Sequence, residues 1–457
     1  MQKLIINEKK VHFIGIGGIS MSGLARILLT LGIPVSGSDR SNSDAVNRLR
    51  VLGAEISIGH KAGQHGNATL VVYTPAIDEE NPELSAARQA NIPCIRRDEL
   101  LGRIIRQYKH SIGIAGMHGK SSCTSMTATV MLECHTDPTI HIGAVLPAIG
   151  GSVRVGGNEF FVTEADEYKE SFLKFPPTIA VILNIDEDHL DYYRDINHII
   201  DTFHKFAGLL PADGACIVNG DDPLALQTGL DAPCRHITFG LGENNQWRAT
   251  NIEANNQGCH SFQLIHEGKE ICPVALNVPG RHHVYNALAA IAASALCGVD
   301  PAQAAAALAH YTGAERRFML VGTADGCEIY HDYAHHPTEI RATLEAAALR
   351  PHKALWCVFQ PHTYSRTKAL FEQFTACFAK ADKVILTDIY AAREPDPGDI
   401  HSRMLCDAVN AQLGAGRCRY AASQAEAAEL VKTERQSGDL IVTMGAGDIE
   451  QINRMLL

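Results

Sequence analysis

Short β-forming runs alternate with helix-forming stretches along almost the whole chain, and this alternation restricts the possible folds more than any other feature. The predicted strands lie at 11–15, 34–39, 55–58, 70–73, 92–95, 111–115, 160–163, 179–183, 215–218, 328–331, 353–359, 383–387 and 439–443. Such alternation is typical of parallel sheets covered by helices. Because 457 residues are too many for one hydrophobic core, we expect three α/β domains, at 1–107, 108–314 and 315–457.

The composition limits where the protein works and what it binds. A net charge of −11 and the lack of a basic arm argue against a nucleic-acid partner. Thirteen scattered cysteines without a Cys-x-x-Cys pair indicate free thiols in a reducing compartment. Residues 1–10 contain no apolar signal-peptide core, and the apolar run 287–297 is too short to cross a bilayer. We therefore expect a cytoplasmic monomer or homodimer that does not enter a membrane.

A glycine-rich segment with a lysine follows the predicted strand at 111–115. It consists of Gly116, Met117, His118, Gly119, Lys120, Ser121 and Ser122. In such a loop glycines turn backbone N–H groups inward, lysine reaches the β- and γ-phosphates, and a hydroxyl ligates Mg²⁺. The general P-loop pattern requires glycine at position 114, where this chain has isoleucine. The segment predicts nucleoside-triphosphate chemistry, and a glycine-rich turn with a solvated lysine is the structural alternative.

A second glycine-rich turn follows the first predicted strand. It contains Gly15, Gly17, Gly18, Ile19 and Ser20, and the next predicted strand ends with Ser38 and Asp39. This order approaches the dinucleotide fingerprint, in which glycines admit a diphosphate and an acid binds ribose. Serine stands where the third glycine of that fingerprint belongs. The turn predicts a bound diphosphate, from NAD or from a nucleotide sugar, and a tight turn without a ligand is the structural alternative.

Acidic residues gather after two strands of the second series. Glu164 ends one predicted strand and His189 follows another, each among further carboxylates. The carboxyl ends of parallel strands are where open α/β sheets bind ligands, and Mg²⁺ prefers oxygen donors. We expect Glu164 to ligate Mg²⁺, and His189 to complete a second Mg²⁺ site or orient the γ-phosphate. Solvated acidic loops are the alternative.

Other polar residues stand at predicted helix starts and at a domain boundary. Asn286 lies in the first turn of a predicted helix, where it either binds an adenine edge or caps the helix, and capping fits the sequence better. Arg316 and Arg317 lie at the boundary, where an arginine can reach a phosphate. Of the neighbouring His335 and His336, we expect one to be functional and the other structural.

His362 and Arg366 lie four residues apart after the predicted strand at 353–359. On a helix that begins there, both side chains would share one face. Arginine suits a carboxylate through bidentate pairing. An ordinary helix start on the surface is the alternative.

Taken in order, these segments resemble the Mur ligases over essentially the whole chain. Eight segments carry the resemblance: HFIGIGG from His12, SGSD from Ser36, GMHGKS from Gly116, EADE from Glu164, DHLD from Asp188, AERRF from Ala314, DYAHHPTE from Asp332 and QPHTYSRT from Gln360. The shortened phosphate loop fits the family's own Gly-x-His-Gly-Lys-Thr form. Within the family, the compact opening at His12 resembles the ligases that use L-alanine.

The resemblance implies a fold and a reaction. A Rossmann-like first domain would bind the UDP part of UDP-N-acetylmuramate, a central P-loop-type ATPase domain would bind ATP and Mg²⁺, and a Rossmann-like third domain would bring in the amino acid. ATP would phosphorylate the lactyl carboxylate, and the amine of L-alanine would then displace phosphate from the acyl phosphate. This is an ADP-forming ligation in peptidoglycan precursor synthesis.

The resemblance also assigns roles to individual residues. The catalytic residues would be Lys120, His189, His335 and Arg366. The ATP-binding residues would be Gly116, Met117, His118, Gly119, Lys120, Ser121, Ser122, Asn286, Arg316 and Asp332. The UDP-sugar-binding residues would be Gly15, Gly17, Gly18, Ile19, Ser20, Ser38 and Asp39. The amino-acid-binding residues would be His335, His362 and Arg366, with His335 as the base for the amine. Mg²⁺ would bind Ser121, Glu164 and His189.

The chain departs from the family pattern at three places, which leaves rival functions to consider. Ser121 to Cys123 replace threonines, His283 replaces an asparagine and Thr363 replaces an arginine. The rivals are a ligase that attaches a whole recycled tripeptide to the same sugar acid, a non-catalytic Mur-like binding protein, and a nicotinamide-dependent dehydrogenase. Lys120, Glu164 and His189, which match the family, argue against the second rival, and only the first glycine turn supports the third.

Overall fold

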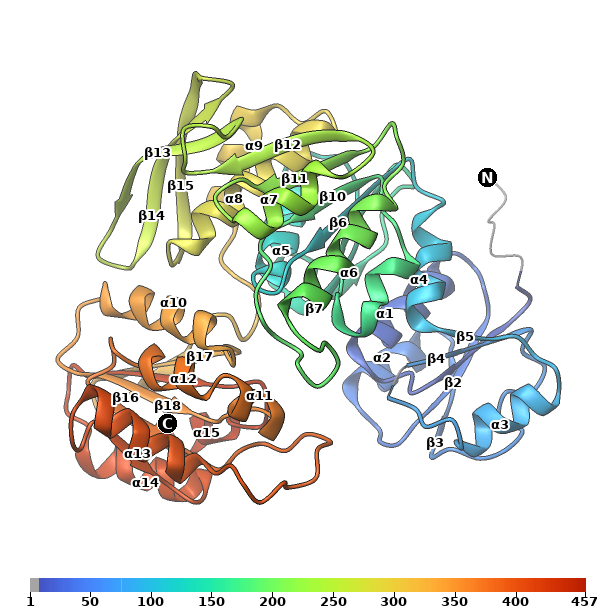
Figure 1. Cartoon of the computed structure of the whole chain (residues 1–457). Helices are drawn as coiled ribbons and strands as arrows, with labels where there is room; N and C mark the ends of the chain where they lie inside the picture. The colour runs from blue at the N-terminus through green and yellow to red at the C-terminus, as the bar shows by residue number, and fades with distance from the viewer. Residues whose placement is uncertain (1–7, 75) are drawn as a thin grey trace.

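The computed structural model describes residues 8–74 and 76–457, whose strands form three separate sheets. Figure 1 shows the central domain above, the first domain in blue at its lower right and the third domain in orange and red at its lower left. The sheets contain 5, 10 and 6 strands. The predicted boundaries at 107 and 314 fall between the first and second sheets and between the second and third.

The first sheet is entirely parallel, in the order β3-β2-β1-β4-β5. Its elements are β1 (Val11–Ile14), α1 (Ile19–Thr30), β2 (Val35–Asp39), α2 (Asp44–Val51), β3 (Glu55–Ile58), β4 (Leu70–Tyr73), α3 (Pro82–Gln89), β5 (Cys94–Arg96) and α4 (Arg97–Ile105). Strand order reverses beside β1, so the glycine turn after β1 lies where open α/β sheets bind ligands.

The central sheet has the order β15-β14-β13-β12-β11-β10-β6-β9-β7-β8. Its strands are β6 (His110–Ala115), β7 (Thr139–Leu146), β8 (Gly151–Arg154), β9 (Phe160–Glu164), β10 (Ile179–Ile182), β11 (Ala215–Asn219), β12 (Arg235–Gly240), β13 (Trp247–Ala254), β14 (Cys259–His266) and β15 (Lys269–Pro279). Its helices are α5 (Lys120–Glu133), η1 (Pro147–Ile149), η2 (Tyr168–Lys174), α6 (Ile196–Gly208), α7 (Pro223–Leu230), α8 (His282–Leu296), α9 (Pro301–Ala307) and η3 (Leu308–His310). Strand β6 lies between β10 and β9, which determines what surrounds the phosphate loop.

The third sheet has the order β16-β17-β21-β18-β19-β20 and is parallel except for the β16–β17 pair. Its strands are β16 (Met319–Ala324), β17 (Cys327–Asp332), β18 (Leu355–Phe359), β19 (Lys383–Leu386), β20 (Cys418–Tyr420) and β21 (Leu440–Met444). Its helices are α10 (Pro337–Ala348), α11 (Tyr364–Ala369), α12 (Phe371–Cys377), α13 (Ser402–Leu413), α14 (Gln424–Glu434) and α15 (Gln451–Leu456). The predicted three-domain α/β class is confirmed.

Local sequence explains where many helices begin. Asn81, Asp222 and Asp300 each accept hydrogen bonds from N–H groups of the first helical turn, and each is followed by proline. The side chain satisfies donors that have no partner within the helix, and proline lacks the N–H that would be unsatisfied there. Helix α8 is apolar and buried on nearly every face, as its sequence predicted.

Several strands were missed by the sequence prediction, namely β7, β8, β12 to β16 and β20. The largest missed group, β13 to β15, is an antiparallel extension with alternating exposure, so it lacks the apolar runs of the parallel strands. Glu267 and Gly268, the two residues that connect β14 to β15, both have positive φ (50° and 76°), as a type I′ hairpin turn requires.

Hydrophobic packing joins the first two domains but not the third. One buried cluster extends from Leu24 and Ile104 in the first domain to Phe172 and Phe203 in the central domain. The buried clusters of the third domain contain only third-domain residues among those described. Polar contacts therefore carry much of its attachment. All thirteen cysteines carry free thiols, and no helix within 8–74 and 76–457 is long and apolar enough to cross a membrane.

Candidate active site

The phosphate loop connects β6 to the N-terminus of α5, as the sequence predicted. Gly116 and Gly119 have φ values of 144° and 83°, which L side chains rarely adopt. A Cβ atom at Gly119 would also lie 3.1 Å from Oδ1 of Asn286. The loop therefore needs glycine at both positions for backbone reasons, and at Gly119 for packing as well. The N–H groups of Met117 and His118 donate to Asn184, and the loop ends at the N-terminus of α5, where anions bind.

Lys120 is held inside the loop by three groups. Its ammonium donates hydrogen bonds to the carbonyl oxygens of Gly116 (2.7 Å) and Met117 (3.2 Å) and to Oε1 of Glu167 (3.0 Å). Burial alone would lower the pKa of Lys120, but the carboxylates of Glu167 and Asp166 outweigh burial and raise it. The amine is therefore cationic when an anionic phosphate arrives.

Two of the three predicted Mg²⁺ ligands touch each other. The hydroxyl of Ser121 lies close enough to Glu164 to favour its ionised form, and Glu164 accepts the N–H of Gly143 at 2.7 Å. Burial raises the pKa of Glu164 despite these donors and the nearby Lys120. A divalent cation would relieve that desolvation, and a hydroxyl with a carboxylate is an oxygen donor set that Mg²⁺ accepts. His189 points instead to Glu167, with Nε2 3.2 Å from Oε1.

Two cavities, of about 470 Å³ and about 550 Å³, meet at the phosphate loop. Gly119, Arg317 and Glu339 line both. Of the predicted site residues, the smaller cavity is also lined by His118, Ser122, Asn286 and Asp332. The larger is lined by Ile19, Ser20, Met117, Lys120, Ser121, Glu164, His189, Arg316 and His335. The structure thus brings residues of all three domains to one pair of connected cavities.

The other predicted UDP-sugar-binding residues, which are Gly15, Gly17, Gly18, Ser38 and Asp39, do not line these two cavities. Asp39 accepts the N–H of Gly17 at 2.7 Å, and a Cβ atom on Gly17 would lie 2.8 Å from that carboxylate. Asp39 therefore fixes the glycine turn in this structure. The hydroxyl of Ser38 is fully buried between Glu83 and His60. Its carbonyl oxygen accepts the N–H groups of Gly15 and Ile16, so Ser38 presents no exposed group to a ligand in this structure.

Three consecutive acids after β10 bind the third domain. Asp186 accepts the hydroxyl of Thr338 (3.0 Å), the carbonyl oxygen of Glu187 accepts Nε2–H of His336 (2.9 Å), and Asp188 accepts Nε–H of Arg366 (2.8 Å). Both side chains of the last pair are more than 90% buried. Arg366, which the sequence assigned to a substrate carboxylate, therefore uses part of its guanidinium to join two domains.

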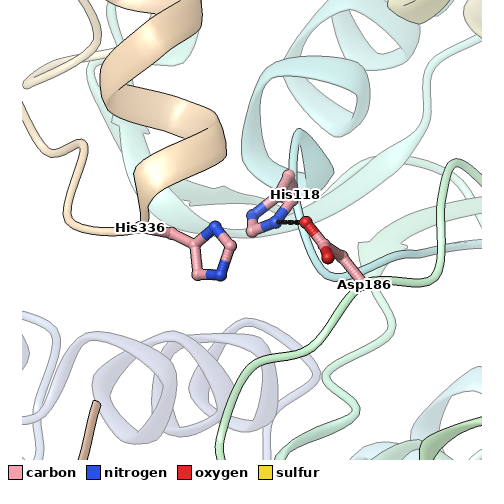
Figure 2. A group of neighbouring side chains, drawn as sticks. All are labelled: His118, Asp186 and His336. Carbon is pink, nitrogen blue, oxygen red and sulfur yellow. Dashed lines mark hydrogen bonds and ion pairs between the residues drawn. The ribbon is translucent and has the colours of Figure 1, made fainter. Parts of the chain in front are cut away.

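His118 of the phosphate loop takes part in the same interface, as Figure 2 shows with Asp186 and His336. His118 Nε2 lies 3.0 Å from Asp186 and Nδ1 lies 3.4 Å from Glu339. Burial would lower the pKa of His118, but the carboxylates of Asp186 and Glu339 raise it to about 9. His118 is thus a charged link between the loop and α10.

His118, Asp186 and His336 also place their possible ligand atoms within 4.8 Å of one another, as a metal site would. His336 has no free nitrogen, however, because Nδ1 accepts the N–H of Thr338 and Nε2 donates to the carbonyl of Glu187. We interpret the group as an interdomain contact. His336 caps α10, so it is the structural member of the predicted histidine pair.

His335, the other member, lies on the larger cavity near Glu339, with Nδ1 3.3 Å from Oε2. Burial lowers the pKa of His335 to about 3, so its imidazole is neutral. The rings of His335 and His362 lie 5.9 Å apart, centroid to centroid. His362 in turn lies 3.1 Å from Nη1 of Arg366, through its Nδ1. The predicted amino-acid residues therefore form one group.

Two local predictions were wrong. Asn286 is not a helix cap, because α8 begins at His282 and its N-cap residue is Arg281; the side chain of Asn286 instead faces Gly119. His362 does not lie on the helix of Arg366, because α11 begins at Tyr364. The contact between His362 and Arg366 comes from a loop.

Two residues of the site, Glu167 and Glu339, were not predicted, and of the two boundary arginines the assigned ATP-binding residue was Arg316. Arg317 lines both cavities, whereas its predicted neighbour Arg316 lines only the larger one and donates to the carbonyl of Gly447. Glu339 faces both His118 and His335. Glu167 belonged to a recognised acidic segment, but nothing in its spacing distinguished it from the other acids.

A phosphate loop with its lysine and a hydroxyl–carboxylate pair, at the junction of three α/β domains, are the groups that a nucleoside-triphosphate-dependent enzyme needs. Comparison with known families narrows this class, and the chain belongs to the Mur ligase family. Family models match residues 10–109 ("Mur ligase family, catalytic domain"), 114–294 ("Mur ligase middle domain") and 316–447 ("Mur ligase, glutamate ligase domain").

Two curated relatives within that family share one name, and a solved structure carries a similar one. UDP-N-acetylmuramate--L-alanine ligase from Clostridium beijerinckii is 48% identical, covering 97% of this chain and 96% of its own length. The enzyme of that name from Clostridium novyi is 49% identical, covering 99% and 98%. The crystal structure of UDP-N-acetylmuramate-alanine ligase MurC from Thermotoga maritima is 27% identical, with a TM-score of 0.81 over 98% of both chains.

Proposed function

We propose that the protein is an ATP-dependent ligase that joins L-alanine to the lactyl carboxylate of UDP-N-acetylmuramate, in peptidoglycan precursor synthesis. The observation that carries this proposal is the pair of cavities that meet at Gly119 and are lined by all three domains. The shared name of the relatives supports the choice of both substrates. Use of ATP and thirteen free thiols support a cytoplasmic location.

The smaller cavity suits the adenosine part of ATP. The rings of His282 and His283 lie 4.1 Å apart there. Burial lowers the pKa of His282 to about 4 and that of His283 well below its usual value, so both rings are neutral surfaces for a purine. Asn286 adds an amide that can hydrogen-bond a base edge. The phosphates would then pass Gly119 into the larger cavity.

Charge stabilisation in the larger cavity would come from Lys120 and the neighbouring cations. Phosphoryl transfer depends mainly on positioning and on neutralising charge at the transferred group. Ser121 and Glu164 would hold Mg²⁺, with His189 as a candidate for a second ion. Bound Mg²⁺ would supply further positive charge at the phosphates.

The acyl acceptor step would take place beside the third domain. The lactyl carboxylate attacks the γ-phosphorus, ADP leaves, and the amine of L-alanine then attacks the acyl carbon as phosphate departs. His362 and Arg366 would orient the amino acid. His335, neutral and on the cavity wall, remains our candidate to accept the amine proton, and anionic substrates would raise its low pKa towards a useful value.

The decisive experiment measures phosphate release from ATP with each co-substrate present or omitted. We expect release only with UDP-N-acetylmuramate and L-alanine together, and a loss of at least about 100-fold in Lys120→Ala. A tripeptide in place of L-alanine tests the related recycling activity. Turnover without either co-substrate, or none with both, would refute the proposal.

A further inference from the structure

Among the acidic residues near the larger cavity, Glu167 is the most deeply buried. Its side chain is fully buried and ion-paired with two groups that the proposed reaction uses. Lys120 Nζ lies 3.0 Å from Oε1 and 2.8 Å from Oε2, and His189 Nε2 lies 3.2 Å from Oε1. One carboxylate thus bridges the phosphate-loop lysine and a candidate metal ligand 69 positions away in the chain.

The main chain of Glu167 is also held in place. The hydroxyl of Tyr193, a buried side chain, donates to the main-chain carbonyl of Glu167. His189 adopts a left-handed backbone conformation, with φ at 53°, which costs free energy for a histidine. The N–H of His189 donates to the carboxylate of its neighbour Asp188. The constrained backbone of His189 therefore directs its imidazole towards Glu167.

A purely structural ion pair would not need this arrangement. Taking a carboxylate out of water is costly, and replacing a buried pair by apolar groups is often neutral or stabilising. Here the buried carboxylate contacts the lysine of the phosphate loop. Lys120 uses two of its three N–H donors on loop carbonyls and the third on Glu167. The position of Glu167 therefore determines where the ammonium group lies.

We propose that Glu167 is a positioning residue for phosphoryl transfer, which holds Lys120 and His189 at the separation that the transferred phosphoryl group requires. This inference rests on the proposed function. It requires no contact between Glu167 and substrate, because Glu167 acts through the two side chains it binds.

Two substitutions separate the effect of the Glu167 charge from the effect of its position. Glu167→Gln keeps the size of the side chain but removes the negative charge that faces Lys120 and His189. Glu167→Asp keeps the charge but shortens the side chain by one methylene group. We expect both variants to lose kcat, by about 100-fold for Glu167→Asp, since a displacement of about 1 Å at a reacting centre has that order of effect.

Nucleotide binding should respond differently from kcat. Glu167→Gln leaves the site more positive, so it should bind ADP, measured by calorimetry without Mg²⁺, at least as tightly as the parent protein. Glu167→Asp should bind ADP with parental affinity. A merely structural role predicts instead that both variants lose thermal stability and ADP affinity together.

Glu170→Gln is the matched control. Glu170 lies three residues further on, is half-buried, and contacts Thr202, His198 and Lys205 on α6. The same chemical change there should leave kcat and ADP affinity unchanged. Parental kcat in both Glu167 variants, or ADP affinity that falls in parallel with stability, would overturn the inference. Failure of the parent protein to release phosphate would refute the proposed function, whereas parental kcat in the Glu167 variants of an active enzyme would refute the inference alone.

Discussion

The charged link between His118, Asp186 and Glu339 should make the stability of the protein depend on pH. Burial opposes the charge, but the two carboxylates raise the pKa of His118 from 6.5 to about 9, which corresponds to about 3 kcal/mol. Burial would raise the pKa of Asp186, but His118 beside it lowers that pKa from 3.8 to about 2, which corresponds to about 2 kcal/mol. Asp188 also acts on His118, His336 also acts on Asp186, and Asp186 is about a third exposed to screening solvent. We therefore take the smaller value, about 2 kcal/mol, for the whole contribution of His118 to stability.

The sign follows from the direction of each pKa change. A histidine whose folded pKa is raised stabilises the protein fully below 6.5 and loses that contribution as the pH rises through 9. An aspartate whose folded pKa is lowered stabilises fully above 3.8 and loses it as the pH falls through 2. The pair is therefore at full strength between about pH 4 and pH 6.5.

The perturbation is His118→Gln, followed by differential scanning calorimetry between pH 6 and pH 9.5. Because 1 kcal/mol shifts Tm by about 2–4 °C in a domain of 150–250 residues, we expect the variant to unfold about 4–8 °C lower at pH 6. The difference should shrink towards zero by pH 9.5. His310→Gln, at a largely exposed histidine, should show no difference at either pH. A difference that is constant or grows with pH would refute the reasoning.

Three further predictions concern packing, the domain interface and metal dependence. A Cβ atom on Gly23 of α1 would lie 2.5 Å from Val153 of β8, so Gly23→Ala should cost about 1–3 kcal/mol in denaturant unfolding, whereas Gly208→Ala, in open space, should not destabilise. Asp188→Asn removes the charged partner of the buried Arg366, which should cost about 3–5 kcal/mol in stability. Because this ion pair joins two domains, small-angle scattering should detect a more open protein. An unchanged scattering profile would contradict this prediction. Excess EDTA should abolish phosphate release and added Mg²⁺ should restore it, so release that persists in EDTA would exclude the proposed metal requirement.

Local sequence determined much of the fold and the chemistry of the phosphate loop. Apolar runs predicted the parallel strands, and Asp–Pro or Asn–Pro pairs explain several helix starts. Glycine at 116 and 119 and lysine at 120 predicted the loop, because each acts through its own backbone or side-chain properties. The antiparallel strands β13 to β15 escaped prediction, since half-exposed strands carry mixed residues whose order only a partner strand explains.

Tertiary structure decided which residues share the site. Strand β6 lies between β9 and β10, although β9 and β10 both follow it in the chain, so the phosphate loop meets Glu164 on one side and the acids 186–188 on the other. No spacing in the sequence distinguishes Glu167 from Asp166, yet only Glu167 lies between Lys120 and His189. Sequence determines what each residue can do chemically, whereas strand order and domain docking determine its neighbours, because contacts across a sheet or an interface join residues far apart in the chain.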